Sequence, residues 1–446
     1  MTTDRADAAR AEAADAEAAP RSGTRDSVRD ALAVAVAGLV ANGLNLIVTI
    51  VLARVLPSAN ANAAYGSFTQ MVGLFIVVSL PGSAVAIAVV RRSSWWLARA
   101  GHVELEAWRR AARVRAVRLL CAFAVVAAVA SPFIADALGH RSWVAVLVTS
   151  LAAGTWVALA VDRAFLQSCR RYVPLAGNFL LEGLTKTVAV LVGAAALHVT
   201  GAVAGILFAE LVTWAHASRA AAKAVPDLTS SAPGTPPRGE LGGDLAASVA
   251  AFAMLALLQY ADVFLVGRLN SAGVNRYAAI AVVAKTLVYV AVVLSYYLLP
   301  EASHGHRTGG RARRQLAVVL ALYAVPCAIL LGAAKLDPHG LLSLVYPTRF
   351  LGASGSLAVL VGAMALLGLS FLLSTYLLAR GVRVVAVWLA ANTVFAFYWI
   401  SRAHGITHHT AARDLEAQLL VSIPLLLATG AILVWRRTDS VPSPPR

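Results

Sequence analysis

The stretch PDLTSSAPGTPPRGELGG, residues 226–243, interrupts an otherwise apolar chain and divides it into two halves. Each half contains six apolar runs of about twenty residues or more, the length a helix needs to cross a hydrocarbon core about 30 Å thick. The runs lie near residues 30–55, 65–90, 116–138, 142–166, 173–197 and 201–222, then 245–269, 276–300, 315–335, 354–379, 383–401 and 414–435. The chain is therefore predicted to be an all-α polytopic membrane protein with about twelve transmembrane helices.

The even number of runs in each half predicts how the halves are related. A half with six spans begins and ends on the same side, so the two halves share one orientation and a pseudo-two-fold axis along the membrane normal would relate them. The predicted segments are a disordered cytoplasmic tail (1–27), an N-terminal six-helix lobe (28–223), a cytoplasmic linker (224–244), a C-terminal six-helix lobe (245–437) and a second tail (438–446).

The basic residues are distributed unevenly along the chain. It carries a net charge of +16 although only 13% of its residues are charged, and segment 91–118 alone holds eight arginines. Basic residues collect in the segments on one side of the predicted membrane, the positive-inside pattern that places both termini in the cytoplasm. We interpret the basicity as a topology signal with some attraction to anionic lipids, and predict no nucleic-acid partner. The abundance of arginine and alanine indicates a GC-rich genome and a bacterial plasma membrane.

The chain shows no motif for catalysis, a cofactor or a metal. It lacks the Gly-rich sequence ending in Lys-Ser/Thr that cradles phosphates, and its predicted external loops are short. The cysteines Cys121, Cys169 and Cys327 have unrelated spacings, and His404 and His408 lack an acidic or cysteine ligand nearby. A carrier is therefore favoured over an enzyme.

Polar residues share one face of the fifth span. Asn178, Glu182 and Lys186 follow each other at intervals of four, and Glu182 precedes Lys186 in the favourable order for an ion pair. A charge in the middle of a membrane helix costs about 2.5–3.5 kcal/mol on insertion scales, so it needs a reason. Two interpretations are open: a self-neutralised pair that permits insertion, or a stripe that lines a water-filled cavity.

The seventh and eighth spans carry opposite charges. Lys285 lies well inside the eighth span with no acid at helical spacing, so its partner must be another helix, an anion or water. Gln259 and Asp262 lie three residues apart in the seventh span. Asp262 could titrate or hold a cation, pair with Lys285, or join two helices.

Further polar residues have weaker claims. Glu210 and His216 occupy the sixth span, the first span shows Asn42, Asn45 and Thr49 on one stripe, and Gln70 lies early in the second. The polar side chains of the first two spans either line a cavity or form hydrogen bonds to neighbouring helices.

The stretch YADVFLVGRLNSAGVNRYAA, residues 260–279, resembles the seventh-span motif of polysaccharide flippases in the multidrug/oligosaccharidyl-lipid/polysaccharide exporter superfamily, whose fold is MATE-like. The first half is similar in LARVLP (52–57), YGSF (65–68), Gly82 and Arg91-Arg92. The insertion Ser58–Ala64 departs from the family's shorter loop.

The resemblance implies two six-helix lobes around a central cavity, with Asn45, Arg54, Gln70, Asp262 and Lys285 along its wall. It implies a cargo of lipid-linked oligosaccharide, that is, a polyprenyl-pyrophosphate glycan, or a related glycolipid. Lys285, Lys186, Arg54, Asn45 and Gln70 are then candidates for substrate and phosphate binding. Asp262, Glu182 and Glu210 are candidates for coupling to H+ or Na+ or for pairing within the cavity.

Other functions stay open. A cation-coupled multidrug exporter of the same superfamily is the second hypothesis, although the near balance of acidic and basic residues in the spans is atypical of a site for cationic drugs. A peptidoglycan-precursor flippase usually has extra spans. A membrane-embedded glycan-modifying enzyme belongs to a different class. Under the leading hypothesis, envelope glycan assembly enzymes are expected partners.

Overall fold

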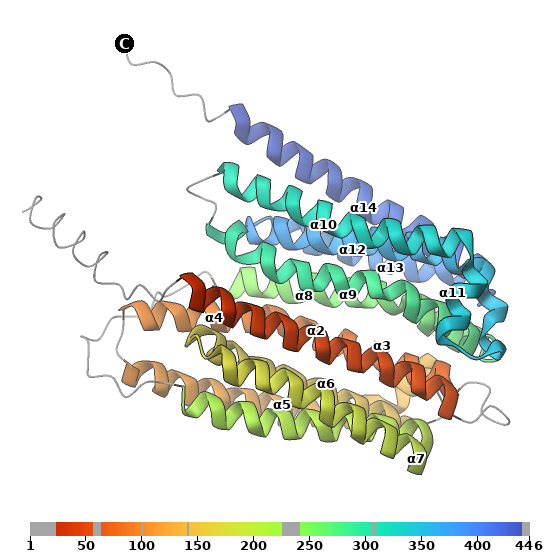
Figure 1. The fold of residues 1–446 in the computed structure, drawn as a ribbon, viewed down its shortest axis with the longest axis horizontal. Helices are drawn as coiled ribbons and strands as arrows, with labels where there is room; N and C mark the ends of the chain where they lie inside the picture. Colours follow the sequence, from red (N-terminus) through yellow and green to blue (C-terminus); the bar gives the residue numbers. More distant parts are fainter. Residues whose placement is uncertain are drawn as a thin grey trace, which may run out of the picture.

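The described part of the chain is a bundle of long helices (Figure 1). The structure, a computed structural model, describes residues 24–56, 64–99, 102–140, 142–224, 241–304 and 309–438. The predicted tails up to 23 and from 439, the linker residues 225–240 and most of the predicted insertion lie outside this range. The elements are α2 (Thr24–Val55), α3 (Ala64–Ser79), α4 (Pro81–Arg99), α5 (His102–Leu138), α6 (Trp143–Ser168), α7 (Tyr172–Ala222), α8 (Leu241–Leu269), α9 (Val274–His304), α10 (Gly309–Leu336), α11 (Pro338–Val345), the 3-10 helix η1 (Thr348–Ser356), α12 (Leu357–Ala379), α13 (Val384–Ser401) and α14 (Thr407–Thr438).

The described helices provide the predicted membrane crossings. Among them, 11 stretches are long and apolar enough to span a bilayer. One stretch, Tyr172–Ala222, has 51 residues and contains a break at Leu197 and His198, where His198 adopts φ 52°. This stretch is therefore two spans, and the prediction of an all-α protein with about twelve transmembrane helices is confirmed.

The two halves of α7 fold back on each other as a close helical hairpin. A Cβ atom on Gly193 would overlap the carbonyl oxygen of Gly201, and one on Gly205 would overlap that of Ala189. Only glycine permits this backbone approach, as is common where membrane helices pack tightly.

The same packing pattern occurs in both halves of the chain. In the first half, α6 packs on α5, on α3 and α4, and on α7, while α2 packs on α7. In the second half, α12 packs on α10, α9 and α14, while α8 packs on α13. Each of these helix contacts in the first half has a counterpart between the equivalent spans of the second half. The chain therefore forms two lobes of similar construction. Figure 1 shows α5–α7 in the lower part of the molecule, α8–α14 in the upper part, and α2, α3 and α4 between them.

The outward surface of both lobes is apolar. Large side chains such as Leu119, Phe133, Val188, Ile329 and Val394 are exposed. Exposed apolar surface on this scale suits lipid and not water. The protein is an integral multi-pass membrane protein.

The lobes meet through the second span. This span bends at Leu80, between α3 and α4, where Pro81 begins the second segment. Helix α3 packs on α8 and α9, and α4 packs on α8. We call the end of the bundle that contains Val55, Ala64, Leu269 and Val274 the predicted external end, following the distribution of basic residues.

Some helices extend beyond the predicted apolar runs. Helix α2 begins at Thr24, inside the predicted tail, and α8 begins at Leu241, inside the predicted linker. Polar residues with adequate helix propensity continue a helix past the hydrocarbon core, and hydropathy does not detect them.

Candidate functional site

The C-terminal lobe encloses an ion pair between its first two helices. Lys285 of α9 donates from Nζ to both carboxylate oxygens of Asp262 on α8, at 2.8 and 3.1 Å. Asp262 is 0% and Lys285 1% exposed. Of the alternatives that the sequence leaves open for Asp262, the structure shows the pair with Lys285.

The α8–α9 hairpin explains why these residues meet. Asp262 lies seven residues before the end of α8 and Lys285 eleven residues after the start of α9, which are distances of about 10 and 16 Å along antiparallel helices. Helical side chains lean toward the N-terminus of their helix, so the lysine stem reaches back to the level of the carboxylate.

Tyrosines complete the surroundings of this pair. The hydroxyl of Tyr277 donates to Asp262 Oδ2 at 3.1 Å. Lys285 Nζ lies 4.6 Å from the centroid of the Tyr260 ring, which adds a cation–π contact. The hydroxyls of Tyr260 and Tyr289 are hydrogen-bonded at 2.7 Å. The ammonium group is thus enclosed by protein groups in this conformation.

A second carboxylate of the same lobe lies nearby on α14. Asp414 is fully buried and interacts electrostatically with Asp262 and Lys285. Its Oδ1 accepts a hydrogen bond from Gln418 Nε2 at 3.1 Å. Within the described residues, Asp414 Oδ2, Gln418 Oε1 and Gln259 Nε2 have no hydrogen-bond partner. With both carboxylates ionised, the cluster would hold two negative charges and one positive charge.

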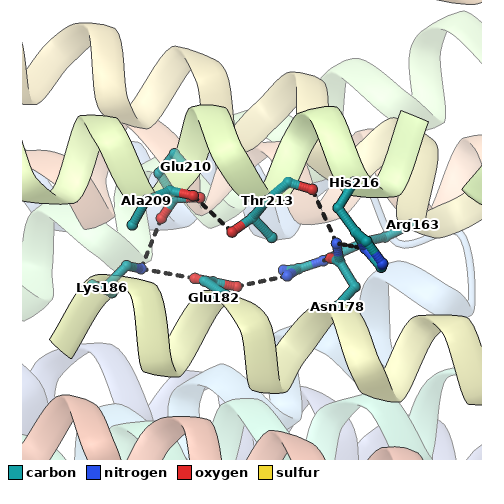
Figure 2. Close-up of polar contacts among 8 residues, drawn as sticks. All are labelled: Arg163, Asn178, Glu182, Lys186, Ala209, Glu210, Thr213 and His216. Atoms are coloured by element: carbon teal, nitrogen blue, oxygen red, sulfur yellow. Dashed lines mark hydrogen bonds and ion pairs between the residues drawn. The ribbon is translucent and has the colours of Figure 1, made fainter. Parts of the chain in front are cut away.

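The N-terminal lobe contains a separate, balanced charge network (Figure 2). Glu182 pairs with Arg163 of α6 and with Lys186, each at 2.7 Å. Lys186 also pairs with Glu210 from the second half of α7, again at 2.7 Å. All four side chains are buried, so two positive and two negative charges neutralise one another.

Asn178 extends this network to the next span. Its Oδ1 accepts from Arg163 Nε at 2.7 Å, and its Nδ2 donates to the carbonyl of Thr213 at 3.0 Å. The ring nitrogen Nδ1 of His216 lies 3.0 Å from the same amide nitrogen. Figure 2 shows these groups in one line between the two halves of α7, so the predicted polar face of the fifth span joins its own lobe together.

The remaining candidates occupy other positions. Asn42 and Arg54 on α2 are exposed, and Asn45 and Thr49 are half-buried. Gln70 is buried and donates from Nε2 to the carbonyl of Leu138 at 3.0 Å. Within the described residues, no hydrogen bond or ion pair joins the cluster of either lobe to the other.

The predicted phosphate-binding role of Lys285 and Lys186 stays a prediction. In this conformation each lysine already binds a carboxylate, so contact with a phosphate would require it to leave that partner. Arg54 and Asn45 retain accessible side chains.

Sequence analysis did not identify several buried ionic residues. One of them is Arg163, which lies near the end of an apolar run. The neighbouring Asp162 accepts hydrogen bonds from Ser218 Oγ at 2.5 Å and from Trp214 Nε1 at 3.0 Å. Asp414 begins the last span, four residues before Gln418. The spacing rule that selects Glu182 and Lys186 would also have selected this pair.

The fold is that of known transporters. No family model matches the chain, and no curated protein matches it. It is similar to a multidrug resistance MATE family transporter of the MOP superfamily in an outward-facing structure, with a TM-score of 0.65, 12% identity and coverage of 93% of this chain and 97% of that chain. For the inward-facing structure of such a transporter, the TM-score is 0.61 and the identity 12%, and the match covers 89% of this chain and 96% of that chain. For the lipid II flippase MurJ in an inward closed conformation, the TM-score is 0.59 and the identity 11%, and the match covers 92% of this chain and 93% of that chain. These similarities concern the fold alone, because the sequence identities are only 11–12%.

Proposed function

We propose that this protein is an alternating-access flippase that moves a lipid-linked oligosaccharide (polyprenyl-pyrophosphate glycan) or related glycolipid across the bacterial plasma membrane for polysaccharide biosynthesis. A fold shared with transporters and a lipid flippase supports a carrier. The observation that carries the proposal is the buried Asp262–Lys285 pair, with its unbalanced neighbour Asp414.

A phosphate can replace the Asp262 carboxylate as the partner of Lys285. Lys285 has a compact ammonium group, which forms the same kind of charge-assisted hydrogen bond with phosphate oxygens as with carboxylate oxygens. A pyrophosphate arriving between the lobes would take this ammonium from Asp262. The released carboxylate then needs a proton or a sodium ion, which couples the cargo to an ion gradient.

The free energy of the buried Asp262–Lys285 pair favours a mechanism in which the pair opens only when both charges gain new partners. Removing one partner of a buried pair typically costs about 3–5 kcal/mol. This corresponds to a factor of roughly 150 to several thousand in population, so the pair would rarely open unless both charges find new partners. Substrate and ion would therefore bind in step.

The experiment compares variants in a strain that lacks the gene. Lys285→Ala alone leaves Asp262 unpaired, so the test also uses the double variant Lys285→Ala/Asp262→Asn, which removes both charges. We expect both to insert, and the double variant to keep wild-type protein levels while lipid-linked oligosaccharide accumulates inside. Lys335→Ala, at the exposed end of α10, is the matched control. Normal glycan export by the double variant would refute the proposal.

A multidrug exporter is the second candidate. When Asp414 is ionised, its carboxylate gives the C-terminal cluster an acidic excess, which suits a cationic drug. Drug sensitivity of the same deletion strain, with normal surface glycan, would favour this function.

A further inference from the structure

Three helix ends of the N-terminal lobe are capped by side chains of the other lobe. All of them lie at the predicted external end. The first is the C-terminus of α2. Arg349 of η1 donates from Nη2 to the carbonyl of Ala53 at 2.6 Å and lies 3.5 Å from that of Leu56. The residue four positions after Ala53 is Pro57, which has no N–H, so the Ala53 carbonyl has no partner within its own helix.

The second end is the N-terminus of α3. The N–H of Gly66, the third residue of the helix, donates to Asn275 Oδ1 of α9 at 2.7 Å. The first four N–H groups of a helix have no partner within it, and a side-chain oxygen normally supplied by the same chain segment caps them. Here the oxygen comes from the other lobe.

The third end is the C-terminus of α5. The backbone N–H groups of Gly139 and His140 bond the carbonyls of Asp136 and Ala135. The next carbonyl, that of Ala137, accepts from Arg268 Nη1 of α8 at 2.8 Å.

Close packing surrounds these caps. A Cβ atom on Gly66 would collide with Val274, and one on Gly267 would collide with Gln70. The hydroxyls of Tyr65 and Tyr346 are hydrogen-bonded at 2.9 Å. The lobes cannot separate at this end without exposing or re-solvating every one of these groups.

We infer that Arg349, Asn275 and Arg268 form a latch that holds the predicted external ends of the lobes together. Caps within one segment stabilise a helix whatever the lobes do, whereas these caps exist only while the lobes touch. The two arginines also place positive charge at the negative ends of helix dipoles. The inference rests on the alternating access of the proposed function, but not on its substrate.

The test measures the distance between the lobes by pulsed spin-label spectroscopy in nanodiscs without substrate. Labels replace Val55 on α2 and Leu344 on α11, both exposed, in a background with serine at the three native cysteines. We expect Arg349→Gln and Asn275→Ala each to raise the ratio of separated to joined lobes about fivefold, the usual effect of losing one cap. Asn275→Asp keeps the acceptor oxygen and should restore the wild-type ratio, which shows that the variants fold.

The matched controls bind within their own lobe. Arg402 contacts Tyr398, and Asn270 donates to the carbonyl of Gly405. Arg402→Gln and Asn270→Ala should leave the distance distribution unchanged. A separated population that does not respond to Arg349→Gln or Asn275→Ala would overturn the latch alone. One joined distance in every variant would also contradict the alternating access of the proposed function.

Discussion

Each lobe holds its buried charges in a different balance. In the N-terminal lobe, Arg163 and Lys186 offset Glu182 and Glu210, and both of these glutamates have a basic partner. In the C-terminal lobe, Asp414 has no basic partner of its own among the described residues. The first arrangement suits a structural network, and the second suits a site that gains and loses a cation.

Asp414→Asn should weaken the coupling of transport to its driving ion. The amide keeps the size of the side chain and supplies the missing balance of charge, so the protein should insert and melt like the wild type. Because Asp262 keeps its carboxylate, we expect transport to lose part of its dependence on the ion gradient, measured as export before and after a protonophore and a sodium ionophore. Export that depends on the gradient as strongly as in the wild type would show that Asp414 takes no part in coupling.

Arg163→Met should destabilise the N-terminal lobe by about 3–5 kcal/mol, because Glu182 loses one of two basic partners inside the protein. The measurement is thermal unfolding in detergent. Arg110 pairs with Glu106, but the Arg110 side chain is 74% exposed, so Arg110→Met should have almost no effect. The double variant Arg163→Met/Glu182→Gln should recover part of the loss; no recovery would mean that packing, not charge, sets the cost.

The site could be predicted from sequence only where its partners are close in the chain. Glu182 and Lys186 share one helix face, and Asp262 and Lys285 lie in adjacent spans, so both pairs were among the alternatives considered. Arg163 with Glu182 depends on how α6 packs on α7. No spacing rule contains that information.

At the scale of elements, the apolar runs identified the spans but not their internal geometry. The hydrocarbon thickness fixes the length of a span, which is why runs of about twenty residues suffice. The division of α7 at His198 agrees with the predicted boundary between two spans. Helix α11 and η1 are not predicted, because such short elements have no apolar period long enough to detect.

The α7 hairpin makes a prediction about its glycines. Gly193→Ala should cost about 1–3 kcal/mol, since the new Cβ has no room against the Gly201 backbone. Gly177→Ala, in the same helix with open space around it, should be neutral or stabilising by up to about 1 kcal/mol. Yield and melting temperature of the two variants provide the measurement. Equal losses would show that the approach of the two halves is not tight.

The turn between α5 and α6 should respond to pH. Burial lowers the pKa of His140, and its ring nitrogen Nδ1 accepts a hydrogen bond from the Ser142 N–H at 3.1 Å. Below a pH of about 6.5 the unfolded chain binds a proton that the folded turn resists, so stability should fall as the pH falls. His140→Gln should flatten the dependence of melting temperature on pH, whereas His339→Gln, at an exposed position of α11, should not. An equal slope in both variants would contradict this role.

At the scale of the molecule, two lobes of like construction meet through α3, α4, α8 and α9. The sequence predicted the lobes, because six spans on each side of a linker leave few other arrangements. The sequence does not predict the contacts between lobes, since they join residues 131 to 296 positions apart, such as Ala53 and Arg349. Under the proposed function, the capped ends and the buried ion pair would have complementary roles: the caps would favour one conformation, and the pair would tie its change to cargo and ion.

The most direct test is transbilayer movement in reconstituted vesicles. Purified protein would be placed in liposomes that contain a fluorescent polyprenyl-pyrophosphate oligosaccharide, with and without an imposed proton or sodium gradient. We predict gradient-dependent flipping by the wild type and by Lys335→Ala, and none by Lys285→Ala/Asp262→Asn. Flipping by the double variant at the wild-type rate, or none by the wild type under either gradient, would contradict the account.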